Sequence, residues 1–217
     1  MARFRRILRR RKPVRRVRRL FRRRVRRKAR SGNLHVKFCK STTIHPAANT
    51  VNVWASNFIL NDFPEYVALA KNFESTTVKR IAVRIVPMQN VSNNSTSRIP
   101  AYCMLPWHYP GPAPKDFNTY LSSDRVKIFR GTQTGRQTYV PSTIEMTQNL
   151  DPTTGAPVPI PGDIKWRPTI RWNKDARIYG GLIAFQGDPT LTAKDQGHYN
   201  IFITVYCKMN NQTTINV

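Results

Sequence analysis

The segment Tyr199–Lys208, YNIFITVYCK, shows most clearly which kind of fold this chain adopts. Apolar Ile201, Ile203 and Val205 occupy every second position, and other side chains stand between them. This two-residue period is typical of a β-strand that buries one face in a core. The segment Val78–Ile85 has a similar alternation, with Lys and Arg among its apolar residues. Both segments therefore predict strands with one buried and one exposed face.

The rest of the body, residues 32–217, has the same character, because β-branched and aromatic runs alternate with stretches rich in Pro, Asn, Ser and Gly. The predicted strands are Leu34–Ile44, Val51–Ile59, Thr76–Pro87, Ile99–Trp107, Arg125–Arg130, Arg136–Pro141, Ile164–Trp172, Gly181–Phe185 and Tyr199–Lys208. The predicted loops are Asn90–Arg98, Pro106–Pro114 and Asp151–Gly162. Helical spacing is confined to Pro64–Glu74 and Lys115–Leu121. We predict one all-β domain of about eight strands, a two-sheet sandwich or jelly roll.

Residues 1–31 form a separate N-terminal arm with an extreme composition. Residues 1–30 contain 18 of the 37 Lys and Arg and no Asp or Glu, so the arm carries +18 of the formal net charge of +26. Such a segment has too few apolar side chains to offset its ordering entropy and its like-charge repulsion. We therefore predict that the arm is disordered until a polyanion binds it.

Arginine makes up most of the arm, which favours nucleic acid as the polyanion. A guanidinium stays charged, forms paired hydrogen bonds to phosphate oxygens and stacks on bases. The predicted nucleic-acid-binding residues are Arg3, Arg5, Arg6, Arg9, Arg10, Arg11, Lys12, Arg15, Arg16, Arg18, Arg19, Arg22, Arg23, Arg24, Arg26, Arg27, Lys28 and Arg30. The same basic runs fit a nuclear localisation signal, and nothing in them reads a base sequence.

Apolar residues within the arm allow a second interpretation. Val14, Val17, Phe21 and Val25 have helical spacing, so residues 14–28 are expected to become helical once phosphates neutralise their charge. A basic amphipathic helix on a membrane surface is the competing interpretation, which we disfavour because Arg surrounds the apolar stripe. The chain has no apolar run of transmembrane length and no signal peptide, so we expect neither membrane insertion nor secretion.

No catalytic or cofactor-binding pattern is visible, so we expect no enzymatic activity and no cofactor. Asp62 and Glu65 have no His, Ser or Cys motif around them, and Asp62 is expected to cap the helix that begins at Pro64. His35 and Cys39 share a strand face but do not make a metal site on their own. Three widely spaced cysteines indicate a reduced, intracellular protein rather than a disulfide framework.

The body offers further candidates for contact with nucleic acid, each with an ordinary structural alternative. Tryptophans stack on bases in single-strand-binding proteins, but we favour the core or an interface for Trp54, Trp107, Trp166 and Trp172. Three roles are open for the basic residues of the predicted strands. They line an inner wall that contacts DNA, they bind a sulfated glycan outside, or they simply face solvent. These residues are Arg80, Arg84, Lys165, Arg167 and Arg171. The sequence leaves the three interpretations open.

Several segments, in order behind the arm, resemble the capsid proteins of circoviruses and cycloviruses, which are small viruses with circular single-stranded DNA. The segments are Phe58–Pro64 (FILNDFP), Phe73–Pro87, and Gly180–Phe185 followed by His198–Tyr206. The resemblance covers most of the chain. It implies an eight-stranded jelly roll of the viral capsid type and a T=1 icosahedral shell of sixty copies. This chain is shorter than typical circovirus capsid proteins and differs from them in its central loops, which fits cycloviruses better.

The resemblance also implies partners and locations. They are the single-stranded DNA genome, host nuclear import receptors and, in some members, cell-surface sulfated glycans, with the protein in the virion and in the host cell nucleus. Sixty arms bring on the order of a thousand positive charges, the scale of the phosphates in a small genome. The alternative is a cellular nucleic-acid-binding protein of the ribosomal or chromatin type, which the long Pro-rich loops and large β body disfavour.

Overall fold

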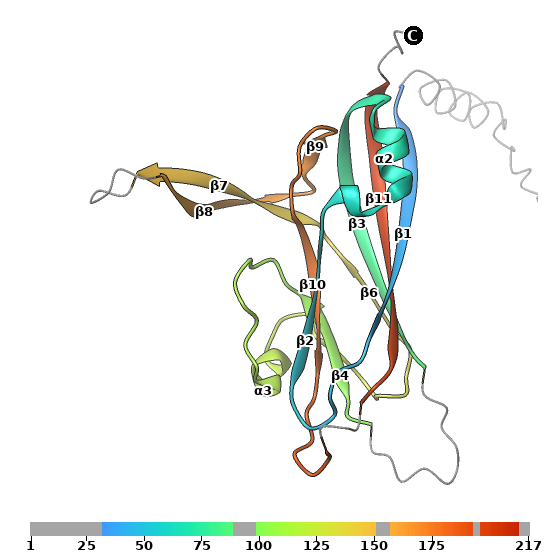
Figure 1. Cartoon of the computed structure of the whole chain (residues 1–217), viewed down its shortest axis with the longest axis vertical. Coiled ribbons are helices and arrows are strands. Elements are labelled where there is room, and N and C mark those ends of the chain that lie inside the picture. Colours follow the sequence, from blue (N-terminus) through green and yellow to red (C-terminus); the bar gives the residue numbers. More distant parts are fainter. Residues whose placement is uncertain (1–31, 89–98, 151–156, 193–195, 213–217) are drawn as a thin grey trace, which may run out of the picture. The chain divides into compact units, whose positions relative to one another are not determined.

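Two antiparallel sheets make up the body in the computed structural model (Figure 1). The structure describes residues 32–88, 99–150, 157–192 and 196–212, with backbone alone at 146–150 and 157–161. Met1–Gly32 and Asn33–Val217 are separate units. The arm, residues 1–31, with all its predicted nucleic-acid-binding residues and its predicted helix, lies outside the described residues.

The described residues contain eleven strands in the two sheets. The five-stranded sheet has the order β1 (Leu34–Ile44), β11 (Tyr199–Gln212), β3 (Phe73–Pro87) and β6 (Gly135–Tyr139), with β9 (Thr169–Arg171) also on β3. The six-stranded sheet has the order β5 (Lys127–Phe129), β4 (Tyr102–Pro106), β10 (Ile178–Phe185), β7 (Ser142–Leu150) and β8 (Pro157–Trp166), with β2 (Asn52–Phe58) also on β10. The prediction of an all-β sandwich is confirmed.

Strand β11 shows how the alternating sequence builds the core. It pairs with β1 on one side and β3 on the other, so it lies inside the sheet. Ile201 and Val205 are fully buried, whereas Phe202 and Tyr206 point to the opposite face, as the two-residue period predicts. The buried face packs on the second sheet through a cluster that includes Phe38.

Two short helices cover apolar parts of the sheets. Helix α2 (Pro64–Ala70) packs Tyr66 edge-to-face on Phe38, with ring centroids 5.7 Å apart. Helix α3 (Phe117–Leu121) packs on the six-stranded sheet through a second cluster of buried residues, which contains Phe117, Tyr120 and Leu182. Both helices were predicted, although α2 is shorter than Pro64–Glu74.

The predicted role of Asp62 was wrong. Asp62 ends the 3-10 turn η1 (Leu60–Asp62), and its carboxylate accepts a hydrogen bond from the Ile59 N–H at 3.2 Å. The residue before α2 is Phe63, which makes no side-chain cap. The Asp62 carboxylate therefore caps the 3-10 turn that precedes α2. It does not cap α2 itself, because the backbone of Asp62 lies within that turn.

The hairpin of β7 and β8 corrects the predicted loop Asp151–Gly162, since β8 begins at Pro157. Three prolines at alternate positions, 157, 159 and 161, argued against a strand. They suit an edge strand, in which every second N–H points away from the neighbouring strand. The predicted single strand Ile164–Trp172 is also wrong, because a turn at Arg167, with φ of 50°, and Pro168 separate β8 from β9.

Candidate nucleic-acid interface

The structure places three of the five predicted basic body residues on one surface. Arg80 and Arg84 on β3 and Arg171 on β9 are exposed on the outer face of the five-stranded sheet. The other two lie elsewhere, since Lys165 forms an ion pair with Glu145 on the β7–β8 hairpin and Arg167 lies in the turn after it. Sequence spacing did not separate the two groups, because the turn at Arg167 was not predicted.

Strand pairing extends this surface beyond the predicted residues. Arg84 lies opposite Phe202 of β11 on one side and Arg136 of β6 on the other. Arg80 lies opposite Tyr206, and Tyr206 lies opposite Lys37 of β1. We call the surface the basic sheet face, and its members are Lys37, Arg80, Arg84, Arg136, Arg171, Phe202, Tyr206 and Lys208.

The charges of the basic sheet face are not balanced within the described part of the chain. None of its eight members is acidic, and the ion pairs that the structure describes, Arg125–Asp124 and Lys165–Glu145, lie on other elements. Arg84 and Arg136 are directly paired across adjacent strands, where like charges are destabilising. Binding of an anion to this surface therefore lowers its electrostatic free energy.

Two aromatic rings lie among these cations. Phe202 is 41% exposed although its strand is interior to the sheet. The Arg80 guanidinium carbon lies 4.1 Å from the centre of the Tyr206 ring, a cation–π contact. Guanidinium groups bind phosphates and exposed rings stack on bases, so this combination suits single-stranded nucleic acid better than a simple anion.

Sequence reasoning missed Lys37, Arg136, Lys208, Phe202 and Tyr206 as possible contacts. The exposure of the two aromatic residues could have been predicted, because both alternate with the buried apolar residues of Tyr199–Lys208 and so lie on the opposite face of the strand. The cross-strand register that groups the basic residues is a tertiary property. It depends on pairing between segments far apart in the sequence, and no local pattern encodes it.

The other predicted candidates divide into core and surface positions. Trp54 packs on the main core and Trp107 on the cluster beside α3, whereas Trp166 and Trp172 are each 54% exposed. Burial raises the pKa of the Cys207 thiol to about 12, so it stays protonated. Within the described residues, no group of three or more His, Cys, Asp or Glu is arranged to hold a metal ion. No helix there has the length and apolarity needed to cross a membrane.

Comparison with known proteins gives a consistent result. The family model described as circovirus capsid protein matches residues 3–213. The capsid protein of human associated cyclovirus 1 is 42% identical over 190 residues, which is 85% of each chain. The solved 60-mer of the BFDV capsid protein has a TM-score of 0.59 at 13% identity, covering 86% of this chain and 98% of the other. A decameric form of that protein gives a TM-score of 0.53 at 13% identity, covering 82% and 99%.

Proposed function

The chain belongs to the circovirus capsid protein family, and on that basis we propose that sixty copies assemble into a closed T=1 shell around a circular single-stranded DNA genome. The number of copies is that of the BFDV capsid protein 60-mer, which has a similar fold. The jelly-roll body, residues 32–217, forms the shell. The protein is a structural part of the virion.

The arm, residues 1–31, packages the genome in this proposal. The observation that carries it is the density of charge, since 18 of the first 30 residues are basic and none is acidic. Each bound phosphate releases counterions, so the binding is electrostatic and independent of base sequence. All of the arm's Arg and Lys residues take part, from Arg3 to Arg30.

The basic sheet face extends the DNA-binding surface onto the body. Arg84 and Arg136 supply charge, and Phe202 and Tyr206 supply flat rings for bases. These side chains are held in register by paired strands, so they bind with less loss of conformational entropy than an arm that is ordered only by the polyanion, as we predict for residues 1–31. The arm and this face thus act on the same ligand in two different ways.

Entry into the host cell nucleus and attachment to cells complete the proposed function. The Arg-rich runs of the arm act as the signal for nuclear import receptors. Attachment to sulfated glycans uses exposed basic side chains of the body, because sulfate and phosphate are both recognised by guanidinium groups.

The arm's role is tested by comparing three chains: the full chain, a chain without residues 2–31, and a full chain in which the arm's Arg residues are replaced by Lys. Each is examined for closed particles by electron microscopy and for nuclease-protected single-stranded DNA. We expect particles from all three. We expect DNA to be lost without the arm and mostly kept with Lys, which preserves the charge.

Two results would contradict the proposal. Failure of the full chain to form closed particles at any salt concentration would contradict the capsid assignment of the body. Retention of DNA in particles that lack the arm would show that the body, not the arm, holds most of the genome.

A further inference from the structure

The β7–β8 hairpin extends away from the rest of the body (Figure 1). Within the described residues, β7 pairs with the body only at Ser142, opposite Tyr179 of β10. The Thr143 hydroxyl adds one hydrogen bond, to the Arg177 carbonyl at 2.9 Å. From Ile144 outward the two strands pair with each other alone. An isolated two-stranded hairpin is at best marginally stable in water, so we expect another surface to support this one.

Two large apolar side chains are exposed on one face of the hairpin's base. Ile164 is 44% and Trp166 54% exposed, and they lie opposite Ile144 and Ser142, so all four side chains share a face. Natural proteins seldom leave a Trp and an Ile exposed side by side unless the surface has a binding role. Trp is also among the residues that contribute most to binding at protein interfaces.

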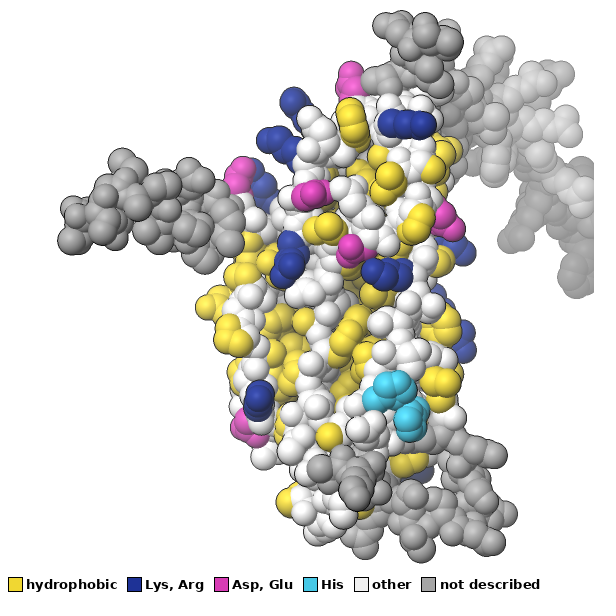
Figure 2. Space-filling view, viewed as in Figure 1, with side chains coloured by type: hydrophobic (Ala, Val, Ile, Leu, Met, Phe, Trp, Pro, Cys, Tyr) yellow, Lys and Arg dark blue, Asp and Glu magenta, His cyan; other side chains and the backbone are white. Residues whose placement is uncertain are grey.

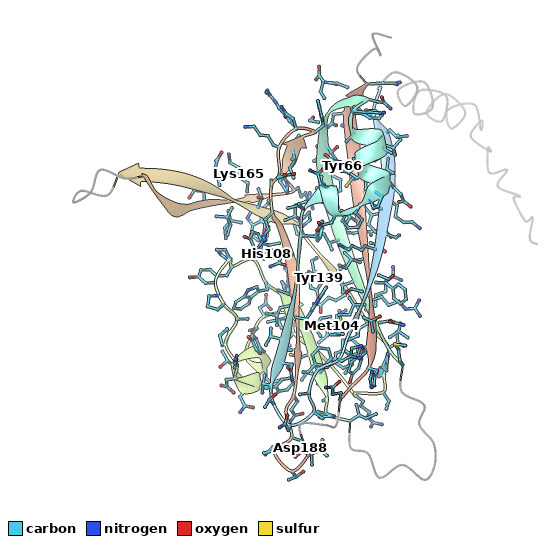
Figure 3. All side chains as sticks on the ribbon, in the orientation of Figure 1. Tyr66, Met104, His108, Tyr139, Lys165 and Asp188 are labelled. Carbon is cyan, nitrogen blue, oxygen red and sulfur yellow. The ribbon has the colours of Figure 1, made fainter. Side chains whose placement is uncertain are left out.

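This face continues onto the body as a row of aromatic rings. The Trp166 ring packs edge-to-face on His108, with centroids 4.6 Å apart, and His108 adjoins Trp107 and Tyr109, whose rings also pack edge-to-face. Tyr109 is 63% exposed. We call the row the aromatic strip, and it comprises Ile164, Trp166, His108, Tyr109 and Trp107. Figure 2 shows hydrophobic side chains gathered below the hairpin, and Figure 3 places His108 there.

A hollow of about 60 Å³ opens at the end of the strip. Three aromatic residues, Trp107, Tyr109 and Tyr179, are among the residues that line it, together with Gly180 and Gly181. On the scale of water-sized spheres this volume holds roughly four, which is room for a short apolar side chain. The strip therefore combines exposed rings with a recess, as binding surfaces often do.

The charges around the strip show what kind of partner it fits. Lys165 and Glu145 neutralise each other, and alternation along β8 directs Lys165 to the opposite face from Trp166. Burial lowers the pKa of His108, which keeps it neutral near pH 7. None of the five members of the strip is charged at this pH, and the exposed residues that flank Ile164–Trp166 in the sequence, Asp163 and Arg167, have opposite signs, whereas the chain as a whole carries +26. Strongly cationic copies repel one another elsewhere and can approach closely at such a surface.

The hairpin's edge excludes one mode of contact. Strand addition needs outward N–H groups along β8, and prolines occupy positions 157, 159 and 161. Strand addition is therefore blocked along the outer part of β8, and a partner at the base of the hairpin meets the side chains of the strip. We propose that the aromatic strip is an interface between copies of this chain, in which apolar side chains of a neighbouring copy pack on Trp166 and fill the hollow beside Trp107. This inference rests on the proposed function, because it assigns one contact of the shell.

The test compares Trp166→Ser with Trp172→Ser in the full chain. The two tryptophans have the same exposed fraction, but Trp172 follows β9 of the other sheet and lies off the strip. Assembly is followed by sedimentation and electron microscopy as a function of protein concentration. We expect Trp166→Ser to raise the concentration needed for assembly at least tenfold, and Trp172→Ser to change it less than twofold. Ile164→Ser serves as a second strip variant, and circular dichroism checks the fold of each.

The outcomes separate this inference from the proposed function. If the wild-type chain forms no closed particles, the proposed function fails, and the strip is then judged by the smaller oligomers that sedimentation detects. Loss of self-association in both strip variants, with Trp172→Ser unaffected, supports the interface. Wild-type assembly by folded Trp166→Ser and Ile164→Ser chains overturns it, and so does equal loss in Trp172→Ser.

Discussion

His108 is a single side chain that links several elements. Its Nδ1 lies 2.8 Å from the Ser142 hydroxyl of β7, and its ring contacts Trp166 of β8. Burial lowers the pKa of His108, while a hydrogen bond to the Tyr179 backbone acts in the opposite direction. The imidazole is therefore neutral in the folded chain at a pH where an unfolded chain already begins to protonate.

His108 is expected to make the fold sensitive to acid. Below pH about 6.5 the unfolded chain takes up a proton that the folded chain resists, so the free energy of unfolding falls until the pH reaches the lowered folded-state pKa. The loss is at most about 1.4 kcal/mol per pH unit, the effect of one proton. His108→Gln, which does not titrate, is expected to lack this part of the pH dependence. The measurement is urea unfolding of both full-length chains between pH 5 and 8. Parallel pH curves would contradict the prediction.

At the scale of an element, strand β10 approaches the opposite sheet closely at Gly181. Its register with β2 shifts between Tyr179 and Leu182, and the Ser56 hydroxyl bonds both backbone groups of Gly181. A methyl group on Gly181 would lie 2.3–2.5 Å from ring atoms of Tyr139 on β6, in the opposite sheet. Tyr139 is only 3% exposed, so its ring has little room to move.

Gly181→Ala is therefore expected to destabilise the fold by about 1–3 kcal/mol or more through overpacking. Gly111→Ala is the matched control, because it creates a similar clash with Tyr109, whose exposed ring can turn aside. We expect Tyr139→Leu to recover part of the stability lost in Gly181→Ala, since it removes the clashing ring. Chemical denaturation measures all three. Equal losses in Gly181→Ala and Gly111→Ala would show that the close approach of the sheets is not the cause.

The elements also show which features sequence could predict. The strands β3 and β11 follow from alternation, because each buries one face, whereas β1 buries only Phe38. The hairpin could not be predicted, since its prolines are compatible with a strand only at a sheet edge, and edge position is set by tertiary structure. The same limit applies to the basic sheet face, whose Arg84 and Arg136 are far apart in the sequence and adjacent only after β3 and β6 pair.

At the scale of the whole molecule, the positive charge has two parts with different physical behaviour. The arm carries +18 in 30 residues, and its predicted disorder in the absence of a polyanion stays a prediction, because residues 1–31 lie outside the described residues. The basic sheet face carries fewer charges at defined positions. If both contact DNA, the arm makes more phosphate contacts than the basic sheet face. Each contact adds separately to the salt dependence of the binding affinity.

This difference leads to a prediction for DNA binding by the full chain. Each phosphate contact contributes about 0.7 to the slope of log affinity against log salt concentration for single strands. Replacing Arg80, Arg84 and Arg136 by Gln is therefore expected to reduce the slope by about 2, while most of the slope, from the arm, remains.

The control replaces Lys115, Lys127 and Arg130 by Gln, which removes the same charge from exposed positions off the basic sheet face. We expect this variant to keep the wild-type slope, because loss of net charge alone does not remove a phosphate contact. Fluorescence anisotropy with an unstructured single-stranded oligonucleotide, over a series of salt concentrations, gives all three slopes. An equal reduction in the two variants would mean that the face acts only through net charge, and an unchanged slope in both would leave the arm as the DNA-binding element.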